Sequence, residues 1–183
     1  MGKIASKWLA RKIAKAISGN LQAQCHVANY YLAKETSTGN REALPWLRLA
    51  AEQGESWAQY QLGLAYDHGW GVRRNIQRAI FWYEKSARQG YDSAQLNLGI
   101  ILANLPGRKK NRRAAIRLYR RAAAQGNRNA CFNLGLYFDE GRGVPRSPKK
   151  GFRWFLRAAK LGDPDSQSRV GFRLHEAKGV RRD

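Results

Sequence analysis

Acidic residues are scarce in this sequence. Its 183 residues include 13 Asp and Glu but 34 Lys and Arg, which gives a net charge of +21. Such an excess favours acidic partners, namely nucleic acid, anionic lipid or an acidic protein, without choosing among them. The sequence also lacks an apolar run of about 18 residues, so we expect no transmembrane helix. It lacks the apolar segment and small-residue cleavage site of a secretory signal.

Residues and motifs typical of catalytic, metal or cofactor sites are scarce as well. The two cysteines, Cys25 and Cys131, argue against a disulfide framework and for a reducing, cytoplasmic location. None of His26, His68 and His175 has a zinc-type partner at short spacing, and there is no C-x-x-C pair. No phosphate-binding glycine loop is present. We therefore expect no catalytic residue, no metal, no cofactor and no small-molecule substrate.

What the sequence does contain is a repeat of 36 residues. Gly54, Gly90, Gly126 and Gly162 are separated by this interval, and each closes a segment such as "AAEQG" or "SARQG". Other columns keep the same step: Ala58, Ala94 and Ala130; Leu62, Leu98 and Leu134; Gly63, Gly99, Gly135 and Gly171; Tyr83, Tyr119 and Phe155. Self-similarity at such a period is typical of repeat architectures.

Each repeat reads as two helices. In the second repeat, Ala58, Leu62 and Tyr66 share one helical face, and Gly63 beside them leaves room for a neighbouring helix. Asn75 is placed to cap a second helix, whose inward face would carry Ala79, Trp82, Tyr83, Ser86 and Ala87. One such hairpin cannot bury its apolar side alone, whereas stacked hairpins can. The sequence therefore predicts an all-α fold, an α-solenoid of antiparallel helix pairs.

These residues closely resemble the Sel1-like repeat (SLR), a relative of the tetratricopeptide repeat, with its pattern A-x-x-x-L-G-x-x-Y, G-x-G-V, A-x-x-W-Y and A-A-x-x-G. The second repeat matches nearly throughout, and the fourth almost as well. The third departs from it, with Leu102 in place of the tyrosine and "NLPGRKKN" in place of the Gly-Val loop. The resemblance implies a right-handed superhelix that acts as a non-enzymatic scaffold and binds other proteins through its surface.

The repeat divides the chain into a basic amphipathic N-terminal helix (1–19), a degenerate first repeat (20–54), three further repeats (55–90, 91–126 and 127–162) and a terminal half-repeat (163–183). Asp183 lies 36 residues after Ser147, at the cap position of a second helix that does not follow. We favour a capping helix at this end. The alternative is a truncated chain.

The basic residues fall into the same register. One row, spaced i, i+4, i+8, consists of Arg113, Arg117 and Arg121, and the equivalent residues one repeat later are Lys149, Arg153 and Arg157. Lys85 lies one repeat before Arg121, at the equivalent position. Residues four apart lie close together on a helix, and packed helices lie about 8–10 Å apart. We therefore expect a basic lattice on one face, which either binds an anionic partner or is only a solvated surface.

The N-terminal segment is a second basic element, with no acid before Glu35. We expect an amphipathic helix with the apolar stripe Ile4, Trp8, Leu9, Ile13 and Ile17. Three interpretations remain open: a cap packed on the first repeat, which we favour; a helix on an anionic membrane surface; and a mitochondrial presequence. The residues that would contact a membrane or partner are Lys3, Lys7, Trp8, Arg11, Lys12 and Lys15.

One group of acids and histidines is brought together by the repeat. Asp139 and Glu140 occupy positions equivalent to His175 and Glu176 in the next repeat, so the four side chains are expected near one another. They could hold a metal or a basic group, but we favour neither. The preferred function is a scaffold or adaptor for an acidic protein partner. Binding of a nucleic-acid backbone by the basic face is the alternative, and a membrane-surface adaptor is the third hypothesis.

Overall fold

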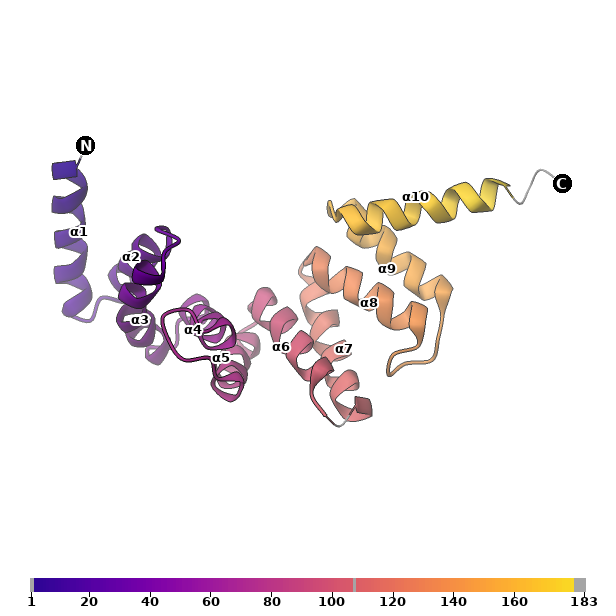
Figure 1. The fold of residues 1–183 in the computed structure, drawn as a ribbon, viewed down its shortest axis with the longest axis horizontal. Helices are drawn as coiled ribbons and strands as arrows, with labels where there is room; N and C mark the ends of the chain where they lie inside the picture. Colours follow the sequence, from indigo (N-terminus) through magenta and orange to yellow (C-terminus); the bar gives the residue numbers. More distant parts are fainter. Residues whose placement is uncertain (1, 107, 180–183) are drawn as a thin grey trace. The chain divides into compact units, whose positions relative to one another are not determined.

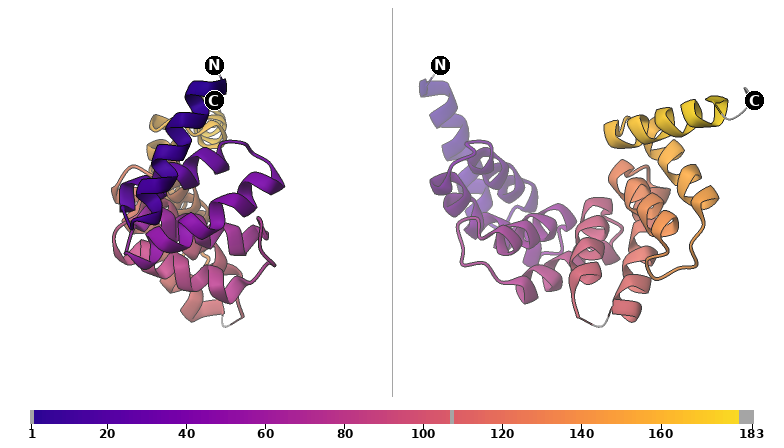
Figure 2. Two further views of the ribbon diagram at one scale, coloured as in Figure 1. Left: turned by 90° about the vertical axis from the view of Figure 1, so that its left-hand side faces the viewer. Right: turned by 45° about the vertical axis from the view of Figure 1, so that its right-hand side comes forward.

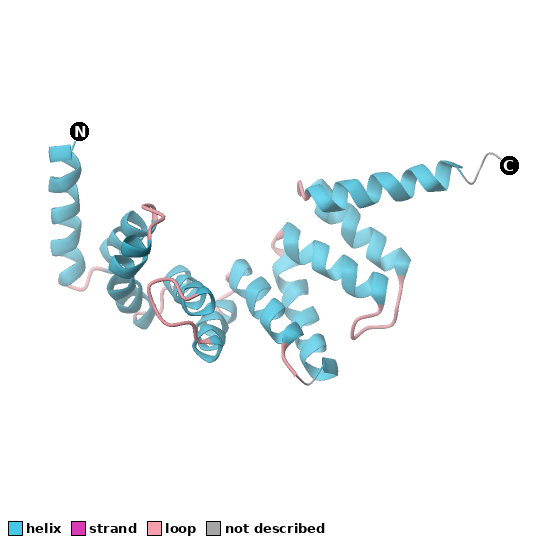
Figure 3. Cartoon of the chain, in the orientation of Figure 1, coloured by secondary structure: helices cyan, strands magenta, loops and turns pink. Residues whose placement is uncertain are grey.

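The computed structural model describes the backbone of residues 2–106 and 108–179 and the side chains of residues 7–106 and 110–175. The described residues form helices joined by loops, with no strand (Figures 1 and 3). The predicted all-α class is therefore confirmed. In chain order the helices are α1 (Gly2–Ile17), α2 (Leu21–Leu32), α3 (Ser37–Glu52), α4 (Ser56–His68), α5 (Ile76–Arg88), α6 (Asp92–Asn104), α7 (Arg108–Ala124), α8 (Arg128–Glu140), α9 (Pro148–Lys160) and α10 (Pro164–Gly179).

The helices pack in chain order within two compact units, Met1–Ala94 and Gln95–Asp183. In the first unit α1 packs on α2, α2 on α3, α3 on α4 and α4 on α5. In the second unit α7 packs on α8, α8 on α9 and α9 on α10 (Figure 2). Each unit thus consists of sequential antiparallel helices whose apolar sides cover one another, which is the solenoid arrangement that the repeat predicts.

The predicted helix ends are found where the sequence places them. The Oδ1 atom of Asn75 accepts a 3.0 Å hydrogen bond from the backbone N–H of Arg78, which caps α5. Ser147 is the N-cap of α9, and Pro148 follows in the first turn. Gly69 ends α4 with φ 77, a left-handed conformation that favours glycine.

The column of glycines inside the first helices allows a very close helix approach. A Cβ atom on Gly63 would lie 2.4 Å from the ring of Tyr83, which is fully buried. The same clash would occur one and two repeats later, at 2.6 Å between Gly99 and Tyr119 and at 2.5 Å between Gly135 and Phe155. The predicted role of Gly63 is confirmed. The aromatic residue 20 positions after each glycine fills the space that the missing side chain leaves.

Buried glutamines connect the helices in a way that the sequence did not lead us to expect. Gln59, only 4% exposed, donates from Nε2 to the carbonyl of Ala51 at 3.1 Å and accepts from Nε2 of Gln89 at 2.8 Å. Gln53 similarly donates to Gln24 at 2.8 Å. These bonds satisfy polar groups inside the stack, because a buried amide without a partner would be destabilising.

Candidate binding surfaces

The basic residues predicted to form a lattice lie on α7 and α9, both in the second unit. All six side chains are exposed, and within the described part of the chain none lies within ion-pair distance of a carboxylate. We call them the α7–α9 basic face: Arg113, Arg117 and Arg121 on α7, and Lys149, Arg153 and Arg157 on α9. No carboxylate among the described side chains therefore neutralises their positive charge by a direct ion pair.

Arg157 links the two rows of this face. Its Nη2 atom donates a 2.7 Å hydrogen bond to the carbonyl of Ala123, in the last turn of α7. A cation at this end of a helix is favourable, because the last carbonyls lack partners within the helix. The guanidinium also lies 5.7 Å from the ring centroid of Trp154. Together with Lys150 and Arg153, these two residues line a hollow of about 320 Å³.

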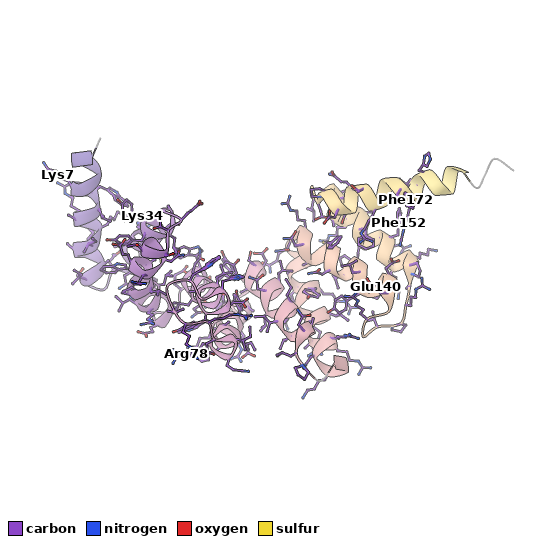
Figure 4. The ribbon with its side chains drawn as sticks, in the orientation of Figure 1. Lys7, Lys34, Arg78, Glu140, Phe152 and Phe172 are labelled. Carbon is purple, nitrogen blue, oxygen red and sulfur yellow. The ribbon has the colours of Figure 1, made fainter. Side chains whose placement is uncertain are left out.

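The two acids between residues 93 and 162 are already paired with arginines. Nη2 of Arg173 on α10 donates to both carboxylate oxygens of Asp139 on α8, each at 2.8 Å. Glu140, labelled at the end of α8 in Figure 4, pairs with Arg142. Asp139 and Glu140 therefore neutralise Arg173 and Arg142, and neither is paired with a residue of the α7–α9 basic face.

The expected proximity of the acid and histidine pairs is only partly met. The residue of α10 that pairs with Asp139 is Arg173 and not His175. The side chain of His175 is exposed, and that of Glu176 lies outside the described side chains. No group of three or more metal-ligating side chains occurs among the residues that the structure describes. Asp139 has its basic partner within the chain, so the pair forms no open pocket for an external basic group.

Lys85 lies in the first unit, on α5. Its Nζ atom is 4.6 Å from the ring centroid of Phe81 and 5.1 Å from that of Trp82. This aromatic support resembles the contact between Arg157 and Trp154, which occupy the equivalent positions two repeats later. The participation of Lys85 in the basic lattice stays a prediction.

The basic helix α1 packs against the first repeat along only part of its predicted stripe. Ile13 and Ala16 contact Ala23 and Val27 of α2, and the ring of Trp8 lies 6.1 Å from that of Tyr30. Ile17, the last residue of the predicted stripe, does not pack on the first repeat, because this side chain is 72% exposed. The contact with α2 is made one position earlier, through Ala16, which turns Ile17 to solvent.

The basic side chains of α1 differ in their surroundings. Lys12 is half-buried, and its Nζ atom lies 3.1 Å from Nδ1 of His26. Lys7, Arg11 and Lys15 are exposed, whereas the side chain of Lys3 lies outside the described ones. A membrane contact of this helix stays a prediction. Among the described residues, no helix is both long and apolar enough to cross a bilayer.

A second cluster of arginines was not predicted. It lies in the first unit, where Arg48 on α3, Arg78 on α5 and the loop before α5 line a hollow together with Tyr66 on α4. The sequence suggested only a core role for Tyr66. The signal that was overlooked is the lack of acids near Arg73, Arg74 and Arg78, which follow one another within six residues.

Comparison with known proteins agrees with the repeat seen in the sequence and in the helices. The model of the Sel1 repeat matches four times, at residues 21–55, 58–91, 92–127 and 128–163. The chain belongs to the Sel1 repeat family. Sel1 repeat proteins are generally scaffolds for protein–protein interaction. No curated protein matches the chain.

Two solved Sel1-like structures are similar to most of this chain. One is c5321, a protective antigen of uropathogenic Escherichia coli with an SLR fold, at 33% identity and a TM-score of 0.81 over 90% of this chain. The other is a Sel1 repeat protein from Oxalobacter formigenes, at 30% identity and a TM-score of 0.76 over 84%. The chain spans 35% of the first protein and 63% of the second.

A more distant structure shares the fold alone. Cysteine-rich protein B of Helicobacter pylori is 22% identical, with a TM-score of 0.56 over 73% of this chain and 96% of that protein.

The Sel1 repeats of the present chain carry two free cysteines, Cys25 and Cys131, within the described residues. Burial raises the pKa of both thiols.

Proposed function

We propose that the chain is a non-enzymatic scaffold and that the α7–α9 basic face binds an acidic segment of a protein partner. The observation that carries this proposal is a set of six exposed cations without ion-pair partners in the described chain, next to two acids that are both paired elsewhere. The family supports a protein as the partner, because Sel1 repeat proteins are generally interaction scaffolds.

Binding would lower the electrostatic free energy of the face itself. Like charges at i and i+4 on a helix repel one another, by about 0.2–0.5 kcal/mol per pair. Glutamate or aspartate side chains placed between the rows would turn these repulsions into attractions. Since the groups are exposed, the interaction should be fast and should weaken with salt.

A nucleic-acid backbone is the second candidate for the same face. Trp154 favours it, because an aromatic ring beside Lys150, Arg153 and Arg157 is the combination on which single-stranded nucleic acids stack. Such binding would release counterions and would fall steeply with salt, whatever the base sequence.

The test is a fluorescence-anisotropy titration of the whole chain with a labelled Glu-rich peptide, and with single-stranded DNA of equal charge. The double variant Arg117→Glu/Arg153→Glu should weaken peptide binding about tenfold or more at low salt. The matched control is Arg41→Glu/Arg88→Glu, with the same charge change at two exposed positions on α3 and α5. Equal losses in the two variants would show that net charge alone attracts the peptide and would refute the proposal. Preference for DNA over peptide would assign the face to nucleic acid.

A further inference from the structure

The arginine cluster of the first unit surrounds a hollow of about 520 Å³ between α3, α4 and the start of α5. Its polar lining consists of Arg48, Tyr66, Arg73, Arg74, Asn75 and Arg78. We call these six residues the Arg48–Arg78 pocket. Arg78 is labelled on α5 in Figure 4. The pocket lies outside the α7–α9 basic face, so a ligand could bind in it whether or not that face binds an acidic protein.

The four guanidinium groups form no ion pair with a carboxylate among the described residues. The lining contains no acid, and in the described part of the chain none of the four lies within ion-pair distance of one. Two of them are held in place by neutral groups: Nε of Arg74 donates to the carbonyl of Asp67 at 2.7 Å, and Nη1 of Arg78 donates to the Tyr66 hydroxyl at 3.2 Å. The pocket therefore presents fixed donors and positive charge to one small volume.

The pKa of the buried Tyr66 hydroxyl reflects this positive charge. The residue is only 6% exposed, and its hydroxyl accepts the hydrogen bond from Arg78, which also lines the pocket. Burial by itself would raise its pKa, but the hydrogen bonds and charges of Arg78 and Arg48 outweigh burial and lower the pKa. A site that favours the anion of its own tyrosine also favours the anion of a ligand.

A second hollow adjoins the first. It has a volume of about 380 Å³, shares Arg48, Tyr66 and Arg78, and adds Phe81, Trp82 and Glu52. Phe81 is 50% exposed, and its ring lies at 78° to that of Trp82, with the ring centroids 5.0 Å apart. The carboxylate of Glu52 would repel an anion at this end. An anionic group therefore belongs among the arginines, and an uncharged planar group belongs next to Phe81 and Trp82.

We propose that the Arg48–Arg78 pocket binds the phosphate group of an aromatic phosphate monoester, with the ring of the ligand in the adjoining hollow. A guanidinium group can donate two parallel N–H hydrogen bonds to two oxygens of a phosphate group. A phosphate monoester carries a charge of about −1.5 to −2 at neutral pH. Four guanidiniums around one hollow suit this doubly charged group better than a single carboxylate. Phe81 and Trp82 line the adjoining hollow and offer apolar surface against which an aromatic group can pack.

The chain contains a natural counterpart that lacks the features of this pocket. Two repeats later the equivalents of Arg48, Tyr66 and Arg78 are Arg120, Phe138 and Lys150, and Pro145 replaces Arg73. Both cations lie near the Phe138 ring, at 6.0 and 5.9 Å from its centroid. Arg146, the equivalent of Arg74, adds a third positive charge. The counterpart nevertheless has no hydroxyl group and only two guanidiniums at these positions, where the Arg48–Arg78 pocket has four. It therefore supplies a matched control.

The experiment is an NMR titration of the whole chain at constant ionic strength, following arginine Nε–H signals. The probes are inorganic phosphate, phenyl phosphate and adenosine 5′-monophosphate. We expect saturable binding of phosphate and at least tenfold tighter binding of one or both aromatic esters. Tighter binding of phenyl phosphate would indicate that the ligand is an aryl phosphate such as a phosphorylated tyrosine. Tighter binding of adenosine 5′-monophosphate would indicate a nucleotide.

The double variant Arg48→Gln/Arg78→Gln should weaken ester binding tenfold or more, and Tyr66→Phe should weaken it several-fold. Arg120→Gln/Arg146→Gln removes the same charge from the counterpart, leaves the hollow beside Trp154 intact, and should change the affinity less than twofold. Circular dichroism would verify that each variant is folded. Equal losses in the two double variants, or no saturation with any probe, would overturn the proposal. An affinity for both esters no higher than for phosphate would overturn the role of Phe81 and Trp82.

Discussion

Gly63 and Tyr83 fix the distance between the two helices of the second repeat. The tyrosine ring lies where the glycine has no side chain, and a Cβ atom there would come within 2.4 Å of it. Since Tyr83 is fully buried, the ring cannot move to solvent to relieve the contact. The 36-residue recurrence of this pair makes it the basic packing unit of the fold.

We predict that Gly63→Ala lowers the free energy of unfolding of the first unit by about 1 kcal/mol. Overpacking of a core costs about 1–3 kcal/mol, which exceeds the gain of about 1 kcal/mol from replacing glycine by alanine in a helix. Urea unfolding followed by circular dichroism measures the difference. Gly171→Ala is the matched control, because nothing lies within 4 Å of its Cβ position. The control should be neutral or stabilising, and a loss of stability there as large as at Gly63 would contradict the packing argument.

The ion pair between Arg173 and Asp139 should hold α10 to α8. Its side chains are only 33% and 19% exposed, so it is less screened than a surface pair. We expect Arg173→Met, which keeps an apolar stem, to increase amide hydrogen exchange in α10 about threefold or more. In the control, Glu84→Gln removes the exposed i, i+4 partner of Arg88 and should leave exchange in α5 nearly unchanged. Unchanged exchange in α10 of the first variant would show that apolar packing on α9 alone holds this helix.

Tyr119 should make the second unit sensitive to alkaline pH. Burial and the neighbouring Tyr137 raise its pKa above the ordinary value of 10.0. The unfolded chain then loses the phenolic proton at a lower pH than the folded chain. The resulting stability is fully present below about pH 10 and is lost as the pH rises further.

The measurement is denaturant unfolding of the wild type and Tyr119→Phe between pH 8 and 11. The variant should lose less stability above pH 10 than the wild type does. Tyr66→Phe should act in the opposite direction, because the arginines around Tyr66 lower its pKa. Parallel pH profiles for the wild type and Tyr119→Phe would refute this assignment.

The parts of the fold that follow from local rules could be predicted from the sequence. Asn75, Ser147 and Gly69 cap their helices because cap chemistry depends on neighbouring residues only. The close approach at Gly63 could be predicted because the repeat places the same residues at the same positions in each hairpin.

Contacts made by long polar side chains could not be predicted in the same way. Arg157 reaches the carbonyl of Ala123, 34 residues away, and spacing alone does not show which way a long side chain turns. The pair of Arg48 and Arg78 does not recur one repeat later, where the equivalent residues are Glu84 and Ala114, so periodicity did not reveal it. On α1, a stripe through Ile17 was as regular as one through Ala16, and only packing on α2 decides between them.

The most direct test of the central claim, that the α7–α9 basic face binds an acidic protein segment, is a map of where such a segment contacts the chain. Backbone amide shifts of the isotope-labelled chain would be followed by NMR during titration with a Glu-rich peptide that carries a spin label. We predict that signal loss is strongest near Arg117 and Arg153 and that added salt reverses it. Signal loss spread evenly over all basic helices, or centred on α1, would contradict the claim.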